Sequence, residues 1–407
     1  MTMKQPGYPL VKIGSLSLSE PGAFKIGPFG SSLKKDELTK EGIPVVGIEN
    51  VLANSFVPAF RRFISQEKFE QLSQYLIKPG DVLVTTMGTV GRAAVVPHAI
   101  GTAIIDSHLF RMRVDHSKVN PTYLCFGING FIGMQQEISQ MASGAIMAGL
   151  NTKILKECSI PLPSLSEQQR IAMILTEQMA AVNHARAAAE AQLEAAKALP
   201  ATYLRAIFNS SEAQQWPRKK LGDVLQLRKE VIHPYDNLKG PAIFVGLEHI
   251  ESLTGNRIGS VDLEMSQLTG RKPRFLSGDI VYGYLRPYLN KVWVAEFDGL
   301  CSVDQYVYSV HPDLAVNEFV AWFMRSPVFL DRAPIGTTPG QLPRIRTAEV
   351  ALVEINLPDL DEQTRVLAMI RGQMTETERT RNALVGQLAT INALPEGLLR
   401  QAFSGGL

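Results

Sequence analysis

The sequence predicts an α+β fold in which two homologous domains alternate with two long helices that pair as an antiparallel coiled coil. Two observations lead to this prediction. Residues 160–208 and 355–403 align without a gap at an offset of 195 and share 19 identities in 49 positions. The stretch before each segment holds short apolar runs separated by Gly and Pro, a pattern typical of strands and turns. The chain is therefore a duplication, and each half contains one mixed domain and one helical segment.

The repeat divides the chain into four parts. We predict a first domain at 1–159, a first helical segment with its linker at 160–215, a second domain at 216–354 and a second helical segment at 355–407. Upstream of the repeat the offset drifts. The matches are Asp81 with Asp279 and Asp106 with Asp304 at 198, and Tyr8-Pro9 with Trp216-Pro217 at 208. Insertions and deletions therefore lie within the domains, whereas the helical segments keep their length.

Helical periodicity marks both repeated segments. Apolar residues recur near helical spacing, at Ile171, Leu175, Val182, Ala185, Ala189, Leu193 and Ala196 in the first segment and at Val366, Ile370, Met374, Leu384, Leu388 and Ile391 in the second. We expect Ser164 or Ser166 to cap the first helix and Asp361 to cap the second. Pro200 and Pro395 should end or kink the helices near their last turns. About 33 residues then form each helix, a rod of about 50 Å.

The domains carry strand-like runs that end at Gly or Pro turns. We predict strands at 45–48, 82–85, 93–96, 280–282, 292–295 and 306–308, with a helix late in each domain at 121–140 and 316–330. Strands mixed with few helices, without regular alternation, indicate the α+β class.

Composition excludes several classes of protein. Of the 407 residues, 45% are hydrophobic and 20% are charged, which is typical of globular chains and not of disordered ones. Cys125, Cys158 and Cys301 are too few and too far apart for a disulfide scaffold or a CxxC zinc site, and they suit a reducing compartment. The chain has neither a long apolar run nor an apolar leader core, so we expect a soluble cytoplasmic protein with no membrane partner.

Basic residues are concentrated in the two domains. The whole chain has 41 Lys and Arg against 39 Asp and Glu, but residues 1–159 alone carry 16 basic and 12 acidic side chains. Of the 41 basic residues, 32 lie in the two domains, in clusters beside Gly turns and aromatic residues. Such loops suit contacts with DNA bases and phosphates, although basic clusters are also common on plain solvated surfaces.

The sequence shows no motif for catalysis or metal binding. It contains no GxxxxGK[ST], no GxGxxG and no HExxH, and no Lys has Asp or Glu two positions before it. The repeated aspartates, Asp81 with Asp279 and Asp106 with Asp304, are interpreted as turn or capping residues beside strands. We therefore expect no catalytic residue, no bound metal and no enzyme activity in this chain.

Two repeated motifs carry a resemblance to a known family. They are Ile160-Pro-Leu-Pro-Ser-Leu-Ser-Glu-Gln-Gln-Arg170 and Ile355-Asn-Leu-Pro-Asp-Leu-Asp-Glu-Gln-Thr-Arg365, each followed by a helix that ends Leu-Pro-x-x-x-Leu-Arg-x-x-Phe. A variable domain followed by such a segment, twice over, resembles the specificity (S) subunit of type I restriction–modification systems, the HsdS family. The resemblance covers essentially the whole chain.

The resemblance implies a non-catalytic DNA reader. Each domain would be a target recognition domain that reads one half of a bipartite, asymmetric site in double-stranded DNA, and the paired helices would set the spacer length. The helices would also dock the modification (methyltransferase) subunits, which the family's pattern implies to be two. The resemblance assigns S-adenosylmethionine to these partners, and ATP and Mg to restriction subunits that translocate and cleave DNA, with no cofactor in this chain.

Residue-level hypotheses follow from loop placement and basic clustering. The candidate DNA-binding residues of the first domain are Lys25, Ser31, Ser32, Lys34, Arg61, Arg62 and Arg92. Those of the second domain are Arg271, Lys272, Arg274, Tyr284, Arg286, Tyr288, Lys291, Arg344 and Arg346. The candidate partner-interface residues are Glu167, Gln168, Arg170, Glu362, Gln363 and Arg365.

Two other functions remain open at this point. One is a duplicated protein-interaction scaffold that does not bind DNA. The other is an enzyme with a scattered active site, such as a nuclease or a methyltransferase in its own right. DNA binding separates the scaffold from the reader, and S-adenosylmethionine binding or metal-dependent cleavage by the purified chain separates the enzyme.

Overall fold

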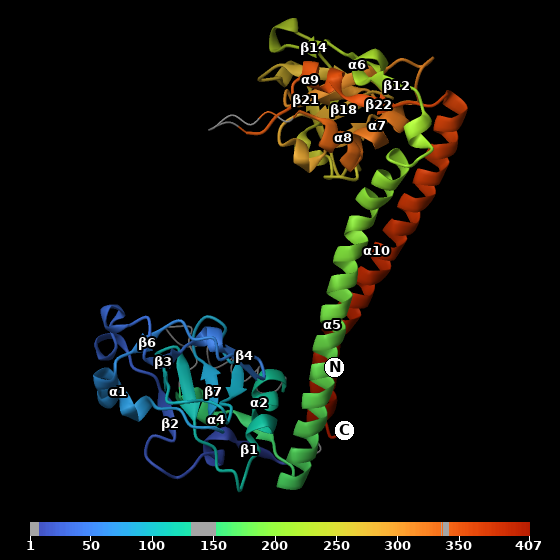
Figure 1. Ribbon diagram of the computed structural model, residues 1–407. Coiled ribbons are helices and arrows are strands. Elements are labelled where there is room, and N and C mark those ends of the chain that lie inside the picture. The colour runs from blue at the N-terminus through green and yellow to red at the C-terminus, as the bar shows by residue number, and fades with distance from the viewer. Residues whose placement is uncertain (1–7, 132–151, 335, 337–341) are drawn as a thin grey trace. The chain divides into compact units, whose positions relative to one another are not determined.

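The computed structural model describes residues 8–131, 152–334, 336 and 342–407, apart from the side chain of Ser31. The chain divides into two compact units, Met1–Ala188 with Leu388–Leu407, and Ala189–Gln387. Each unit contains one mixed domain and parts of two long helices, α5 (Leu165–Phe208) and α10 (Leu360–Phe403), which have 44 residues each (Figure 1). The predicted α+β class is confirmed.

The domain of the first unit is built on a four-stranded antiparallel sheet. Its strand order is β2 (Phe24–Ile26), β10 (Leu109–Met112), β7 (Val82–Thr85), β8 (Ala93–Val95). A second sheet has the order β6 (Phe63–Ile64), β3 (Ile43–Val46), β9 (Ile104–Ile105), and β3 runs parallel to β9. The shorter elements are the pairs β1 (Leu10–Lys12) with β11 (Ser159–Pro161) and β4 (Val51–Leu52) with β5 (Ser55–Phe56), and the helices α1 (Gln66–Leu72), α2 (Pro121–Gly130) and α4 (Thr152–Glu157).

The domain of the second unit repeats this plan with a larger second sheet. Its four-stranded sheet has the order β13 (Leu225–Leu227), β21 (Gln305–Val310), β18 (Ile280–Gly283), β19 (Val292–Val294). The other sheet has the order β14 (Val231–Ile232), β17 (Lys272–Phe275), β20 (Gly299–Cys301), β15 (Pro241–Val245), β16 (Val261–Glu264), with β15 parallel to β20. Strand β12 (Arg218–Lys220) pairs with β22 (Glu354–Asn356), and the helices are α6 (Leu221–Val224), α7 (Asn317–Arg325), α8 (Pro327–Arg332) and α9 (Thr347–Leu352).

Each predicted strand overlaps a strand of these sheets, although β3 ends at Val46, so the strand predicted over 45–48 is confirmed only for 45–46. The late helices appear as α2 in the first domain and as α7 and α8 in the second. The prediction of a helix over 121–140 is confirmed only for 121–130, because residues 132–151 lie outside the described residues.

The helices pair in opposite directions. In the first unit, Ile171 and Leu175 near the start of α5 share a buried cluster with Leu399 and Phe403 near the end of α10. In the second unit, the end of α5 (Leu204, Phe208) shares a cluster with the start of α10 (Val366, Ile370). The antiparallel pairing predicted from the repeat is therefore confirmed.

The predicted helix length is wrong. Both helices have 44 residues and continue past Pro200 and Pro395, which lie inside them. A proline removes one backbone hydrogen bond, but the turns beyond it end in Phe208 and Phe403, which are 3% and 2% exposed. Burial of these side chains against their domains stabilises the last turns despite the proline, because tertiary packing supplies most helical stability in proteins.

One predicted helix cap is also wrong. Ser164 does precede α5, and its Oγ accepts from the backbone N–H of Glu167 at 3.4 Å. At α10 the cap is Asp359, whose Oδ1 accepts from the backbone N–H of Glu362 at 2.9 Å, whereas Asp361 already lies in the first turn. A capping side chain must precede the first helical residue, and Asp361 follows Leu360.

Strand register corrects one of the aspartate matches. Val82 and Ile280 are equivalent positions of β7 and β18. Val82 lies opposite Met112 on β10, and Ile280 lies opposite Tyr308 on β21. Met112 and Tyr308 are therefore equivalent, so β10 corresponds to β21 at an offset of 196. Asp304 is therefore the counterpart of His108, and its match with Asp106 is wrong. Asp81 and Asp279 do correspond: each carboxylate accepts a backbone N–H three residues upstream, at 2.8 Å in both cases. Their predicted capping role is confirmed.

Candidate nucleic-acid interface

The hairpin loops β7–β8 and β18–β19 occupy equivalent positions in the two domains. The N–H of Thr85 donates to the carbonyl of Arg92, and the N–H of Gly283 donates to that of Lys291, both at 2.9 Å. Each loop has two left-handed residues: Gly88 (φ 71°) and Gly91 (φ 84°) in the first, Arg286 (φ 52°) and Asn290 (φ 45°) in the second. Candidate DNA-binding residues of both domains therefore lie on the same structural feature.

The loop of the second domain is braced from three sides. The N–H of Arg286 donates to the carbonyl of Pro343 at 2.8 Å, and Asn290 Nδ2 donates to the carbonyl of Arg325 at 2.8 Å. Lys291 Nζ donates to the carbonyl of Leu247 at 2.6 Å. A left-handed conformation at a non-Gly residue costs about 1–3 kcal/mol, so these bonds hold a strained loop in one shape. The side chain of Tyr288 is 56% exposed, and Arg286 is exposed as well.

Two stacked tyrosines lie at the base of this loop. The rings of Tyr284 and Tyr306 are 4.3 Å apart between centroids and tilted by 17°. Burial, and then the charge of Asp304, raise the pKa of Tyr284, while the charges of Arg344 and Arg271 oppose the shift. Burial also raises the pKa of Tyr306, against the charges of Arg344 and Arg346.

We call this group the tyrosine–arginine cluster; its members are Arg271, Tyr284, Tyr306, Arg344 and Arg346. Arg344 joins it to the loop, because its backbone bridges to Leu285. An aromatic stack surrounded by guanidinium groups can contact both bases and phosphates. From the sequence, Tyr306 is predicted only as a strand residue and not as a candidate for DNA contact, because the stack depends on the register between β18 and β21.

Other candidate residues of the second domain are engaged elsewhere in it. Lys272 Nζ lies over the ring of Phe244, 4.8 Å from its centroid. Arg274 Nη1 forms an ion pair with Glu230 at 2.8 Å. Both residues lie on β17, in the second sheet.

The first domain presents its candidate residues differently. Arg62 Nη2 pairs with Asp106 at 2.8 Å and with Glu49 at 3.1 Å, which neutralises its charge. Lys25 Nζ donates to Gln74 Oε1 at 2.7 Å and lies over the ring of Tyr75. The exposed candidates of this domain are Ser32, Lys34, Arg61 and Arg92. The backbone of Ser31 lies in the 3-10 turn Gly30–Ser32, and its side chain is outside the described part of the chain.

The two glutamines predicted at the partner interface are buried. Gln168 Oε1 accepts from the N–H of Asn120 at 2.8 Å, and its Nε2 donates to the carbonyls of Lys118 and Pro163. Gln363 repeats this pattern with the N–H of Val316 and the carbonyls of Leu314 and Pro358. These amides connect the first turn of each long helix to the segment before α2 or α7.

The charged neighbours of these glutamines lie at the surface. Arg170 binds both carboxylate oxygens of Glu167, at 2.8 and 2.7 Å, and Arg365 binds those of Glu362, at 2.7 and 2.6 Å. The hydrogen bond from each arginine lowers the pKa of its glutamate partner. The prediction of a partner surface now depends on these four residues, because the glutamine side chains are occupied within the chain.

The described parts of the chain show no metal centre and no membrane span. Across these ranges, no three His, Cys, Asp or Glu side chains are grouped so that they could hold a metal ion. None of the helices described is both long enough and apolar enough to cross a membrane.

Comparisons with known proteins agree with this architecture. A family model for the type I restriction modification DNA specificity domain matches residues 24–194. The specificity subunit of the type I restriction enzyme EcoDI from Escherichia coli is 26% identical over 306 residues, 68% of each chain. The EcoKI specificity subunit of Escherichia coli K12 is 23% identical over 295 residues, which cover 67% of this chain and 63% of that protein.

Two solved structures share the fold. One comes from a study of complex assembly and conformational transition of the type I R-M system, with a TM-score of 0.74 and 17% identity over 100% of both chains. The other is the HsdS subunit from Thermoanaerobacter tengcongensis, with a TM-score of 0.65 and 17% identity over 99% of this chain and 98% of that one.

Residues 24–194 therefore match the DNA specificity domain of type I restriction modification systems, and the duplicated mixed domains with their paired long helices share the fold of both solved structures. The chain is similar to the specificity subunits of type I systems in sequence, and it shares the fold of the HsdS subunit.

Proposed function

We propose that this chain selects the DNA sequence on which a cytoplasmic type I restriction–modification complex acts, and that each domain reads one half of a bipartite site through the major groove. The observation that carries the proposal is the equivalence of the two hairpin loops. Both place basic side chains at one position of a shared fold, but the residues differ, with Arg92 in one loop and Arg286, Tyr288 and Lys291 in the other. Different side chains on equivalent loops favour different half-sites and therefore an asymmetric target.

The paired helices, in this proposal, set the distance between the half-sites. The two repeats align without a gap, and both helices have 44 residues, about 66 Å at 1.5 Å per residue. Equal length supports a ruler, because an insertion in one helix alone would break its pairing with the other. The buried Gln168 and Gln363 support the same role, since each connects a domain to the start of a helix.

The same helices would dock two modification subunits, which bind S-adenosylmethionine and methylate adenine, and restriction subunits would add ATP- and Mg-dependent translocation and cleavage. This chain then acts without a cofactor or catalytic residue of its own. The surface pairs Glu167–Arg170 and Glu362–Arg365 are our candidates for docking, because they lie at equivalent places in both units. Two equivalent places support two copies of the partner.

Methylome sequencing tests the proposal directly. The host is sequenced with and without this gene, each time together with its modification subunit. We expect a methylated motif of two short half-sites with a fixed gap, which disappears when the gene is deleted. A duplicated protein scaffold predicts no change in methylation, and in that case the purified complex would also fail to retard duplex DNA at low salt.

A further inference from the structure

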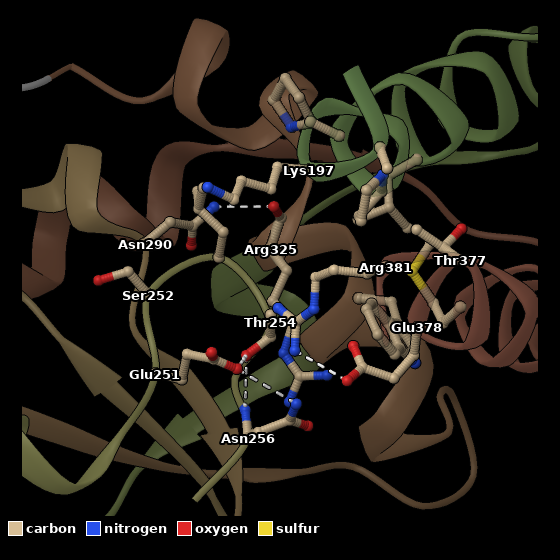
Figure 2. A pocket seen from close by; sticks show the side chains of 18 of the residues that line it. Lys197, Glu251, Ser252, Thr254, Asn256, Asn290, Arg325, Thr377, Glu378 and Arg381 are labelled. Carbon is tan, nitrogen blue, oxygen red and sulfur yellow. Dashed lines mark hydrogen bonds and ion pairs between the residues drawn. The ribbon is translucent and has the colours of Figure 1, made fainter. Parts of the chain in front are cut away.

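A cavity of about 560 Å³ lies within the second unit, between its domain and both long helices. Its lining comes from α5 (196–204), from the loop 251–256, from Asn290 and residues 322–330, and from α10 (374–381) (Figure 2). Small-molecule sites in proteins commonly have volumes of about 300–1,000 Å³. Of the lining residues, the proposed DNA-reading role involves only Asn290, which ends the β18–β19 loop.

Arg325 is the unusual residue of the lining. It is 8% exposed, its Nε donates to the carbonyl of Val292 at 2.9 Å, and its guanidinium lies 4.5 Å from the ring centroid of Trp322. Among the described residues, no carboxylate forms an ion pair with it, and its two terminal nitrogens make no hydrogen bond. The charge of Glu318 acts on Arg325 from nearby, but that carboxylate is bound by Arg371. Burial lowers the pKa of Arg325 to about 10, so it is a buried cation at neutral pH. Such a charge is costly unless an anion pairs with it.

The rest of the lining favours an anion as well. With Arg325, the lining has three cations against two carboxylates, because Arg381 and Lys197 stand against Glu378 and Glu251. Lys197 is paired with Glu194 at 2.6 Å, outside the lining, so the excess positive charge of the lining lies at Arg325. Glu378 is already paired with Arg381 at 2.8 Å. Glu251 accepts from Thr254 Oγ1 at 2.6 Å and from Asn256 Nδ2 at 3.3 Å, so its charge is engaged within its own loop. The apolar part of the lining is formed by Leu204, Leu253, Leu330 and Met374.

The loop 251–256 is shaped to close over the guanidinium. Gly255 has a φ of 70°, and a Cβ there would lie 2.1 Å from the carbonyl oxygen of Val292 and 2.3 Å from Arg325 Nε. Glycine is therefore required for this approach. Asn290 also lines the cavity, and its Oδ1 is buried and accepts no hydrogen bond from the described residues.

We propose that this cavity binds a small organic anion, with a phosphate or carboxylate group on Arg325 and Arg381 and an apolar body against Leu204, Leu253 and Met374. The same site touches the DNA-reading loop, because Asn290 ends that loop and donates to the carbonyl of Arg325. Occupancy would therefore stiffen the loop of the second domain. The site itself does not depend on DNA binding.

Three probes test the proposal on the full-length chain: phenyl phosphate, benzoate and inorganic phosphate, each at an ionic strength matched with sodium chloride. Titration calorimetry measures affinity, and thermal unfolding measures the stabilisation that binding to the folded state produces. We expect saturable binding of phenyl phosphate or benzoate, and the tighter of the two identifies the head group. Inorganic phosphate should bind at least tenfold more weakly than phenyl phosphate, because it lacks the apolar body.

Variants locate the site. Arg325→Gln and Arg381→Met should weaken binding at least tenfold, and Ala201→Phe should block it by filling the cavity. Arg379→Met is the matched control, because Arg379 lies two residues from Arg381 on α10, is 83% exposed and does not line the cavity. If Arg325→Gln unfolds, Arg381→Met and Ala201→Phe still decide the question. Absence of saturable binding by every probe would overturn the proposal. Wild-type affinity in both Arg381→Met and Ala201→Phe would overturn it as well. Equal affinity for inorganic and phenyl phosphate would overturn its apolar half.

Discussion

The hairpin loops β7–β8 and β18–β19 have the same place in the fold, yet they obtain their shape by different means. In the first domain, glycines occupy both left-handed positions of the loop, Gly88 and Gly91. In the second domain, Arg286 and Asn290 occupy them, and the hydrogen bonds that they donate to the carbonyls of Pro343 and Arg325 hold them there. A glycine adopts positive φ without strain, whereas arginine and asparagine need support from their surroundings.

This difference shows how a duplicated fold separates the residues that set its architecture from the loop side chains that it presents at the surface. The parts that repeat, such as the buried glutamines and the long helices, set the architecture. The loops keep their backbone path but change the side chains that it presents. The following predictions test this separation, beginning with the largest expected effect.

Replacing the buried glutamine of either half should destabilise that half, and the two losses of folding free energy should be similar. Gln168→Leu or Gln363→Leu leaves one N–H and two carbonyls without their hydrogen-bond partner in a buried place. Each unsatisfied buried group costs about 1–3 kcal/mol, and water partly relieves this cost. We therefore expect the free energy of unfolding to fall by about 3–5 kcal/mol. Chemical denaturation measures it.

The control uses a second equivalent pair on the same helices. Gln178 and Gln373 each have a buried Oε1 without a partner, so Gln178→Leu and Gln373→Leu should be close to neutral. A large loss in only one of Gln168→Leu and Gln363→Leu would show that the two halves do not share this architectural device.

The braced loop should be sensitive at Asn290. Asn290→Ala removes the bond to the Arg325 carbonyl and places alanine at a φ of 45°. We expect a loss of about 2 kcal/mol in stability, from the lost hydrogen bond and from left-handed strain. The equivalent change in the first loop, Gly91→Ala, should cost only the strain, about 1 kcal/mol.

Thermal unfolding of both variants, together with DNA binding, separates the two means of shaping the loop. An Asn290→Ala variant with unchanged stability and unchanged binding would show that the brace is not needed.

Much of the fold can be predicted from the sequence, because the signals are local or repeated. The gap-free repeat predicts two helices and their antiparallel pairing, and Gly-bounded apolar runs predict the strands of the four-stranded sheets. The continuation of α5 beyond Pro200 could not be predicted, since it depends on the burial of Phe208 against residues more than a hundred positions away.

The DNA-contact residues were less predictable than the fold, because the sequence shows which residues are basic but does not show which of them form ion pairs within the protein. Arg62 is a candidate by sequence, but Asp106, 44 residues later, neutralises it in the fold. The equivalence of the two loops was hidden for a similar reason. Glycine in one loop and Arg286 or Asn290 in the other share a backbone conformation and no side-chain chemistry.

Truncation of Arg286 should affect DNA binding and leave stability almost unchanged, because its side chain is exposed. We expect Arg286→Ala to weaken binding of the assembled complex to its target by about 1–3 kcal/mol, or roughly 5- to 150-fold, if the residue reads a base. Arg92→Ala is the matched change in the first domain. Competition with sites mutated in either half assigns each residue to one half-site. Loss that is uniform over all sequences would mark a phosphate contact instead.

The smallest effect concerns an ion pair that is present only in the second unit. Arg371 on α10 donates to Glu318 on α7, with Nε 2.9 Å from Oε1, whereas the equivalent positions in the first unit are Thr176 and Thr122. The hydrogen bond from Arg371 lowers the pKa of Glu318 below its usual value near 4.5. Since the pKa is lower in the folded state, the pair stabilises the protein fully above about pH 4.5, and this contribution is lost as the pH falls through the folded-state pKa.

Arg371 is 62% exposed, so solvent screening limits the contribution of the ion pair to about 1 kcal/mol or less. Glu318→Gln should therefore lower stability slightly at pH 7 and should flatten the dependence of stability on pH below the usual glutamate pKa. Arg379→Met, in a longer and more exposed pair on the same helix, should leave that dependence as in the wild type. An identical pH profile for Glu318→Gln and the wild type would show that the pair does not contribute to the difference between the two halves.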